Sequence, residues 1–307
     1  MTTSGISIGT PTPARAALVL DDARLCACAQ FHRRDRMEGL IRASGGAPAP
    51  MTSPSASTLD LRILRLLIEG PRATVFVPVP GGEFMLGSPQ RADEQPLRRV
   101  RVRAFEAALT PVTNAEYAHF LDASGHEVPK FWTDPRFNAP ECPVVGISWF
   151  EAMDYCVWLS DLLGRGVRLP TEAEREWAAC GGANTRYPWG DEPWTEGVHG
   201  LGSAGGDRPH PIGTTPPNGY GLYHMADNVH EWCSDWYSPT AYAAFEGDVV
   251  DGPRYDEETL RRASRGGSWR HHVKVSRVAA RSSLAPDFHY NDYGFRVYAD
   301  PLPGASA

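Results

Sequence analysis

The sequence lacks the features that would place it in a membrane or on a nucleic acid. No apolar run among its 307 residues approaches the roughly 18 residues that a membrane-spanning helix needs. Positive charge is also scarce, since 30 lysines and arginines stand against 37 acidic residues and the formal net charge is −7. Nucleic-acid binding normally needs a basic face that neutralises phosphates. We therefore expect no membrane partner, no nucleic-acid partner and a cytoplasmic location.

Cysteine is sparse and poorly spaced for metal or disulfide chemistry. The chain has six cysteines, none of them in a CxxC pair, and none follows Cys233. Such spacing favours reduced, buried thiols over a zinc cluster or a disulfide framework.

Composition divides the chain into a tail and one folded region. Residues 1–57 are rich in Ala, Pro, Ser, Thr and Gly, which is typical of a disordered tail, and Met37 and Met51 are alternative start residues. A short helix capped by Thr58 is expected over 58–71. We expect a single domain over 72–300 and a second short tail over 301–307.

Three segments of the domain predict helices by their start and stop residues. Thr113, Ser148 and Thr171 are suited to cap the first turn, and Gly125 and Gly181 supply stops. Carboxylates of the third helix are expected on its solvent face as paired charges, at Glu172, Glu174 and Glu176.

The remaining sequence predicts short strands and long loops. The stretch ATVFVPVPGGEFMLGS, residues 73–88, predicts a hairpin that turns at the glycine pair. Regular periodicity mostly fails for about 80 residues after Gly182, and nine tryptophans suggest that aromatic side chains supply part of the core. Arg281 and Arg296 lie in apolar strands, so we expect them to pair with buried carboxylates. The fold class is α+β.

Eight motifs occur in one order that resembles a known family. They are GGEFMLGS, PVTNAEYAHFL, PVVGISWFEAMDYCVWL, RLPTEAEREWAA, YPWGDE, NGYGLYHMADNVHEWCSDWY, RGGSW and DYGFRV, over about 75–299. Together they resemble the formylglycine-generating-enzyme, or sulfatase-modifying-factor, domain. The resemblance implies a single domain, related to C-type lectins and low in regular secondary structure.

The chain departs from that family where its chemistry is centred. Family members that generate formylglycine hold Cu(I) with two cysteines placed after a Gly-Gly-Ser-aromatic turn. On this sequence Ser268 matches the serine, while His271 falls on the first thiol position and Ser276 on the second. The usual copper–thiolate mechanism is therefore not available, and these three residues are the catalytic candidates.

The departure suggests a different metal site. Imidazole suits iron, copper or zinc, and a site needs three or four ligands. We predict His271 as the first ligand, with His272 or His230 beside it; further candidate partners are His224, Glu231 and His289. The alternative is that His271 and His272 point to opposite faces of a strand, so that at most one enters the cleft.

A second ion is suggested by the family resemblance. Family members carry structural calcium in the segment MADNVHEW, so Asn228 and Glu231 could supply oxygen ligands. The alternative is that both side chains satisfy backbone donors of a loop-rich region.

Three functional hypotheses follow. The first is a metal- and dioxygen-dependent oxidoreductase, mononuclear if catalytic, or an accessory factor of the same superfamily, using iron or copper. The second is a non-catalytic module that binds a peptide or protein, and the third is formylglycine generation by an altered mechanism. In each case the partner is a peptide, protein or small-molecule substrate that the sequence does not identify.

Overall fold

The three predicted helices begin at the predicted caps. The structure, a computed structural model, describes residues 60–193, 206–244, 249–250, 259–271 and 273–302. Each cap hydroxyl accepts from the backbone N–H three residues on, where a glutamate accepts from the cap's own N–H. A glycine in the left-handed conformation follows each helix. The helices are α3 (Asn114–Ser124), α4 (Trp149–Leu163) and α5 (Glu172–Cys180).

The segments at the two ends are described only in part. The predicted tail 1–57 and the last five residues lie outside the described residues. Inside the predicted helical segment 58–71, the structure has α2 (Leu61–Glu69), followed by the 3-10 turn η1 (Gly70–Ala73). The predicted cap Thr58 lies outside the described residues, and the N-cap of α2 is Asp60, whose carboxylate accepts from the Arg62 N–H.

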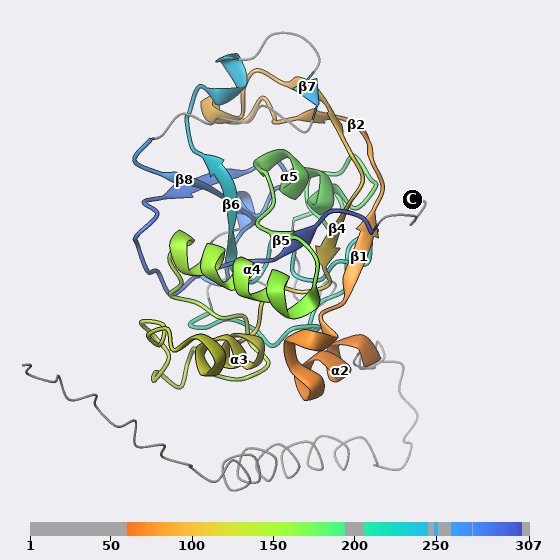
Figure 1. The fold of residues 1–307 in the computed structure, drawn as a ribbon. Helices are drawn as coiled ribbons and strands as arrows, with labels where there is room; N and C mark the ends of the chain where they lie inside the picture. Colours follow the sequence, from red (N-terminus) through yellow and green to blue (C-terminus); the bar gives the residue numbers. More distant parts are fainter. Residues whose placement is uncertain (1–59, 194–205, 245–248, 251–258, 272, 303–307) are drawn as a thin grey trace, which may run out of the picture. The chain divides into compact units, whose positions relative to one another are not determined.

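The strands form three small sheets (Figure 1). The first has the order β1-β4-β11-β5, the second β10-β6-β8-β9 and the third β2-β3-β7. Their bounds are β1 (Phe76–Val79), β2 (Gly82–Leu86), β3 (Arg98–Val102), β4 (Phe105–Ala108), β5 (Val167–Arg168), β6 (His230–Trp236), β7 (Val249–Val250), β8 (Arg262–Arg265), β9 (Arg281–Leu284), β10 (Tyr293–Gly294) and β11 (Tyr298–Ala299). Short 3-10 turns are η2 (Ala92–Glu94), η3 (Ala241–Ala244) and η4 (Val273–Val275).

The hairpin predicted over 73–88 is wrong. β1 and β2 do not pair with each other: β1 pairs with β4, and β2 pairs with β3. Phe76 faces Ala108 and Gly82 faces Val102, so one antiparallel register continues through both pairs. The glycine pair is therefore a bend in a long two-stranded ladder. A Cβ atom on Gly81 would lie 2.9 Å from the Val102 carbonyl oxygen, which explains why glycine stands at the bend.

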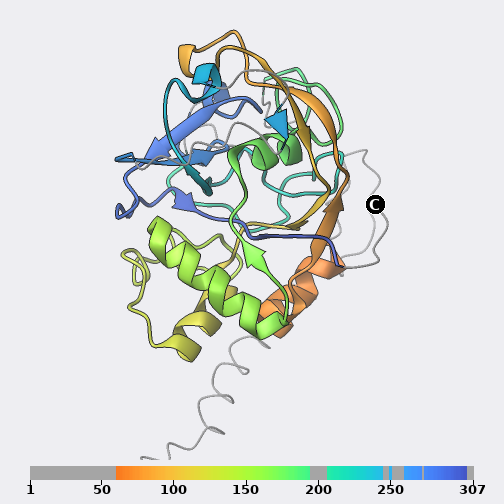
Figure 2. The ribbon, with the colours of Figure 1, turned by 45° about the horizontal axis from the view of Figure 1, so that its top comes forward.

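Helices and sheets enclose two large apolar clusters, and a third, smaller one includes Phe137 and Trp269. Figures 1 and 2 both place α2, α3 and α4 together, away from β2, β3 and β7. One cluster lies among α2, β1 to β4, α5 and β11, and the other gathers α3, α4 and the segment from β10 to Val297 around the fully buried Trp232. This mixed content confirms the predicted α+β class.

Loops carry an unusual share of the structure. Between Cys180 and His230 the described residues contain no helix and no strand beyond one isolated bridge, Tyr187 to Gly190. None of the described helices combines the length and apolar character that crossing a membrane takes.

Substitution of Gly81 tests the bent ladder. We expect Gly81→Ala to lower the free energy of unfolding by about 1–3 kcal/mol, because the new methyl group meets backbone atoms that cannot move aside. Gly166→Ala is the matched control, since a Cβ there meets nothing within 4 Å. Denaturant unfolding of both variants measures the difference, and equal stability would contradict the close approach at Gly81.

Candidate metal centre

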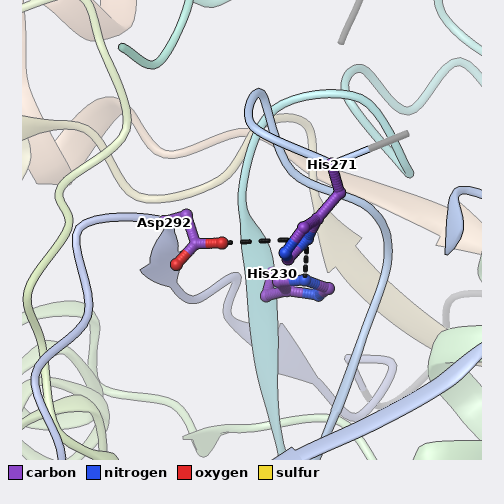
Figure 3. Close-up of side chains that lie close together, drawn as sticks. All are labelled: His230, His271 and Asp292. Atoms are coloured by element: carbon purple, nitrogen blue, oxygen red, sulfur yellow. Dashed lines mark hydrogen bonds and ion pairs between the residues drawn. The ribbon is translucent and has the colours of Figure 1, made fainter. Parts of the chain in front are cut away.

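Three strands of one sheet bring His230, His271 and Asp292 together. His230 is the first residue of β6, Asp292 precedes β10, and His271 follows the turn after β8. The sheet order β10-β6-β8 places these three positions side by side. The backbone N–H of His230 also donates to the Asp292 carbonyl at 2.9 Å. Figure 3 shows the three side chains directed toward one another.

The turn that leads into His271 requires glycine at positions 266 and 267. Gly266 has a φ of 83°, a conformation that favours glycine. A Cβ on Gly267 would overlap Ser276 Oγ and lie 2.5 Å from the Ala226 carbonyl oxygen. The glycine pair is thus required by packing, and it sets the path of the chain into His271.

Ser268 links His271 and Asp292 through its hydroxyl group. Its hydroxyl donates to Asp292 Oδ2 at 2.9 Å and lies 3.0 Å from His271 Nδ1. His271 Nδ1 lies 2.9 Å from His230 Nε2 and 3.8 Å from Asp292 Oδ2. One potential ligand atom from each of the three residues lies within 4.8 Å of the other two.

Burial keeps both imidazoles uncharged near neutral pH. His230 and Asp292 are buried, whereas the His271 side chain is 42% exposed. Burial lowers the pKa of His230, and the Asp292 charge opposes that shift only in part. Burial also lowers the pKa of His271, again against Asp292. Each ring therefore keeps a lone pair that can face a cation.

The spacing suits one shared ion. A metal ion binds imidazole nitrogen at about 2.0–2.1 Å, so two nitrogens that would share one ion can be at most about 4.2 Å apart. The 2.9 Å between the two imidazole nitrogens falls within that limit. Without an ion, the same distance is a hydrogen bond in which one ring donates and the other accepts. His230 Nδ1 is buried and has no partner in hydrogen-bond geometry among the described residues.

Asp292 is the member that sequence reasoning missed. It is the first residue of the motif DYGFRV, which served there only as a marker of the family. A single carboxylate at the start of that motif gave no separate signal. Only the parallel pairing of β10 with β6 shows that it meets His230.

The other predicted site residues that the structure describes make contacts outside the cluster. Ser276 is fully buried against Gly267, and its hydroxyl has no hydrogen-bond partner among the described residues. His272 lies outside the described residues. His224 accepts from the Gly213 N–H and faces Asp227, whereas His289 pairs with Glu151 at 2.8 Å.

The side chains predicted as calcium ligands are engaged in other contacts. The Asn228 amide makes two hydrogen bonds with the backbone of His210, one in each direction. Glu231 is fully buried between Arg175, at 2.6 Å, and Arg296, at 3.1 Å. A carboxylate neutralised by two guanidinium groups has little charge left for a cation.

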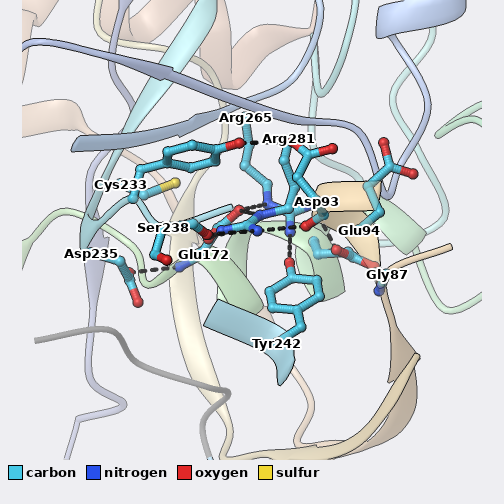
Figure 4. Close-up of polar contacts among 12 residues, drawn as sticks. Gly87, Asp93, Glu94, Glu172, Cys233, Asp235, Ser238, Tyr242, Arg265 and Arg281 are labelled. Carbon is cyan, nitrogen blue, oxygen red and sulfur yellow. Dashed lines mark hydrogen bonds and ion pairs between the residues drawn. The ribbon is translucent and has the colours of Figure 1, made fainter. Parts of the chain in front are cut away.

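A network of buried charges joins α5 to two strands of the same sheet, β8 and β9. Glu172 of α5 pairs with Arg281 of β9 at 2.6 Å and with Arg265 of β8 at 3.2 Å, as Figure 4 shows. Glu176 also pairs with Arg265, at 2.6 Å. The expectation that Glu172, Glu174 and Glu176 face solvent is therefore wrong, because all three are buried. α5 packs against β8, so Glu172 and Glu176 meet buried guanidinium groups, and Glu174 pairs with Arg168 at 2.7 Å. Pairing of Arg281 and Arg296 with buried carboxylates is confirmed.

Comparison with known proteins gives a consistent family. Residues 68–301 match the model of the sulfatase-modifying factor enzyme 1-like domain. The formylglycine-generating enzyme of Streptomyces coelicolor is 36% identical, with 75% of this chain and 91% of that enzyme covered. Hercynine oxygenase of Mycolicibacterium smegmatis is 31% identical over 73% of this chain and 59% of its own length. The structure of PvdO from Pseudomonas aeruginosa superimposes with a TM-score of 0.64 at 27% identity, covering 74% of this chain and 94% of that one.

Removal of the Glu231 charge tests how much its buried ion pairs with Arg175 and Arg296 stabilise the fold around the site. We expect Glu231→Gln to lower the free energy of unfolding by about 3–5 kcal/mol at pH 7, because two buried guanidinium groups lose their shared carboxylate. Glu83→Gln, which breaks an exposed pair with Arg101, is the control and should leave stability unchanged. Comparable losses in the two variants would contradict this role.

The pH dependence of stability, compared between the wild type and Glu231→Gln, gives a second test. Burial would raise the pKa of Glu231, but the charges of Arg175 and Arg296 outweigh burial and lower it below the usual 4.5. The stabilisation is therefore complete above pH 4.5 and is lost as the pH falls through the lower folded-state pKa. Chemical unfolding from pH 7 to pH 3 should show the wild-type advantage over Glu231→Gln shrinking only below pH 4.5. A constant difference over that range would contradict the lowered pKa.

Proposed function

The chain belongs to the sulfatase-modifying factor family, and from that membership we propose that it is a mononuclear, metal- and dioxygen-dependent oxidoreductase. His230, His271 and Asp292 are its metal ligands. Similarity to an enzyme named hercynine oxygenase supports an oxidative reaction within this family. The proposal differs from formylglycine generation by a copper–thiolate pair, because no cysteine follows Cys233 in the sequence.

One observation carries the proposal: two imidazoles and one carboxylate, from the start of β6 and from the loops next to β8 and β10, converge within 4.8 Å. Two histidines and one carboxylate with open positions are the donor set typical of non-haem Fe(II) oxygenases. Imidazole also suits Cu(II), so copper is the second choice, whereas Cu(I) prefers the sulfur ligands that this site does not offer. When bound, Fe(II) would supply the redox chemistry that activates dioxygen.

The surrounding residues would keep this donor set ready. Neutral imidazoles bind a cation without first losing a proton, which the lowered pKa values of His230 and His271 favour. Ser268 donates to Asp292 Oδ2 and so orients the carboxylate toward the two rings. Partial exposure of His271 leaves one side of the centre accessible to a substrate.

Metal binding by the full-length protein tests the proposal. We expect one Fe(II) per chain after anaerobic loading, measured by elemental analysis and by titration. His271→Ala and Asp292→Asn should each weaken binding by more than about tenfold, and Ser268→Ala by about tenfold through loss of carboxylate orientation.

His289→Ala is the matched control, because that histidine pairs with Glu151 away from the cluster. Its Fe(II) stoichiometry and affinity should equal those of the wild type. Absence of stoichiometric metal in the wild-type protein, or equal binding by His271→Ala, would overturn the proposed centre.

A further inference from the structure

Arg270 lies next to His271, the exposed member of the cluster, and it differs in burial and in pairing from the buried arginines described above. Its side chain is 45% exposed, and its Nη1 donates to Asn291 Oδ1 at 3.2 Å. The Asp292 carboxylate lies 3.7 Å away, beyond a hydrogen bond. Arg175, Arg265, Arg281 and Arg296 are instead buried, and each approaches a carboxylate oxygen within 3.2 Å.

The position of Arg270 follows from its two neighbours in sequence and space. It directly precedes His271, and its partner Asn291 directly precedes Asp292. Arg270 thus belongs to the loop that carries His271, and its guanidinium group is hydrogen-bonded to the loop that carries Asp292. Among the described residues, its Nε and Nη2 donate no hydrogen bond. A planar fork of donors is therefore available beside the cluster.

Resting on the proposed metal centre, we propose that Arg270 binds a carboxylate group of the substrate. Asp292 and Arg270 balance each other in charge while no ion is bound. A divalent cation coordinated by Asp292 leaves the pair and the ion with an excess of positive charge, which an anion can offset. A carboxylate fits the bidentate geometry of one guanidinium group.

Phosphate suits this position less well. Phosphate sites commonly use the backbone N–H groups at the start of a helix, and the helical element that follows Arg270 along the chain is only the three-residue turn η4 (Val273–Val275). Two parallel hydrogen bonds from one guanidinium group engage both oxygens of a carboxylate, whereas a phosphate bound in the same way keeps further charged oxygens that need other donors.

Exposed aromatic rings beside the cluster indicate the rest of the substrate. Tyr290 is 44% exposed and Phe288 49% exposed, with ring centroids 5.8 Å apart. Tyr290 packs on Tyr293 at 6.3 Å, and Tyr293 packs on His230 at 4.9 Å. An apolar or aromatic body could lie on these rings while its carboxylate reaches Arg270. The substrate class is therefore a carboxylic acid with an apolar or aromatic body.

Ligand binding to the cobalt-loaded protein tests this assignment without a known reaction. The full-length chain is loaded with Co(II), and benzoate is titrated by calorimetry and by visible absorption. We expect saturable binding of benzoate, with benzamide and inorganic phosphate at least tenfold weaker. Arg270→Gln should weaken benzoate at least tenfold while Co(II) remains at one per chain, because Arg270 is not a ligand. Arg136→Gln is the control, since that exposed arginine pairs with Asp134, and it should bind benzoate as the wild type does.

The outcomes separate the two proposals. Unchanged benzoate affinity in Arg270→Gln, or no benzoate binding by the cobalt-loaded wild type, would overturn the carboxylate site and leave the metal centre standing. Tighter binding of phosphate than benzoate would overturn the assigned substrate class. Failure of the wild-type protein to bind Co(II) at all would instead count against the metal centre.

Discussion

A buried carboxylate held between two arginines is the constraint on which the rest of the structure depends. Glu231 is fully buried, and it compensates the charges of Arg175 from α5 and Arg296 from the segment between β10 and β11. The Arg175 guanidinium group also donates a hydrogen bond to the backbone carbonyl of Met225, and that of Arg296 donates to the carbonyls of Ala108 and Tyr223. Each of these charges would be costly alone in the interior, so the segments that carry them must assemble together.

This constraint also sets the geometry of the candidate centre. His230 is the residue before Glu231, and Gly266 follows Arg265, which belongs to the neighbouring group around Glu172. The strands are therefore anchored by ion pairs on one side while His230 and His271 face the other members of the cluster. A loop-rich protein can hold three side chains at defined distances in this way, although few of its residues are in long helices or strands. The same scaffold could carry either thiolates or imidazoles, since the anchoring residues are separate from the ligands.

Local features of the fold were predictable from the sequence, and long-range pairing was not. Cap residues such as Thr113 and stop residues such as Gly125 act within one helical turn, so their meaning is contained in a few neighbouring letters. The glycine pair after β1 was misinterpreted, because a hairpin turn and a bend in a longer ladder look alike without the partner strand. Likewise, Arg281 and Arg296 indicated buried partners, yet the acidic residues of α5 were placed on the wrong face. Their burial depends on which strands pack against the helix.

The candidate site shows the same division. His271 was noticed because it falls on a thiol position of the family pattern, and His230 because imidazole is a common metal ligand, whereas Asp292 gave no comparable signal. X-ray absorption spectroscopy at the iron edge of the Fe(II)-loaded protein tests the central claim most directly. We predict nearest neighbours that are only nitrogen and oxygen, with the outer scattering pattern of two imidazole rings. A sulfur neighbour, or the absence of imidazole scattering, would contradict a centre built from His230, His271 and Asp292.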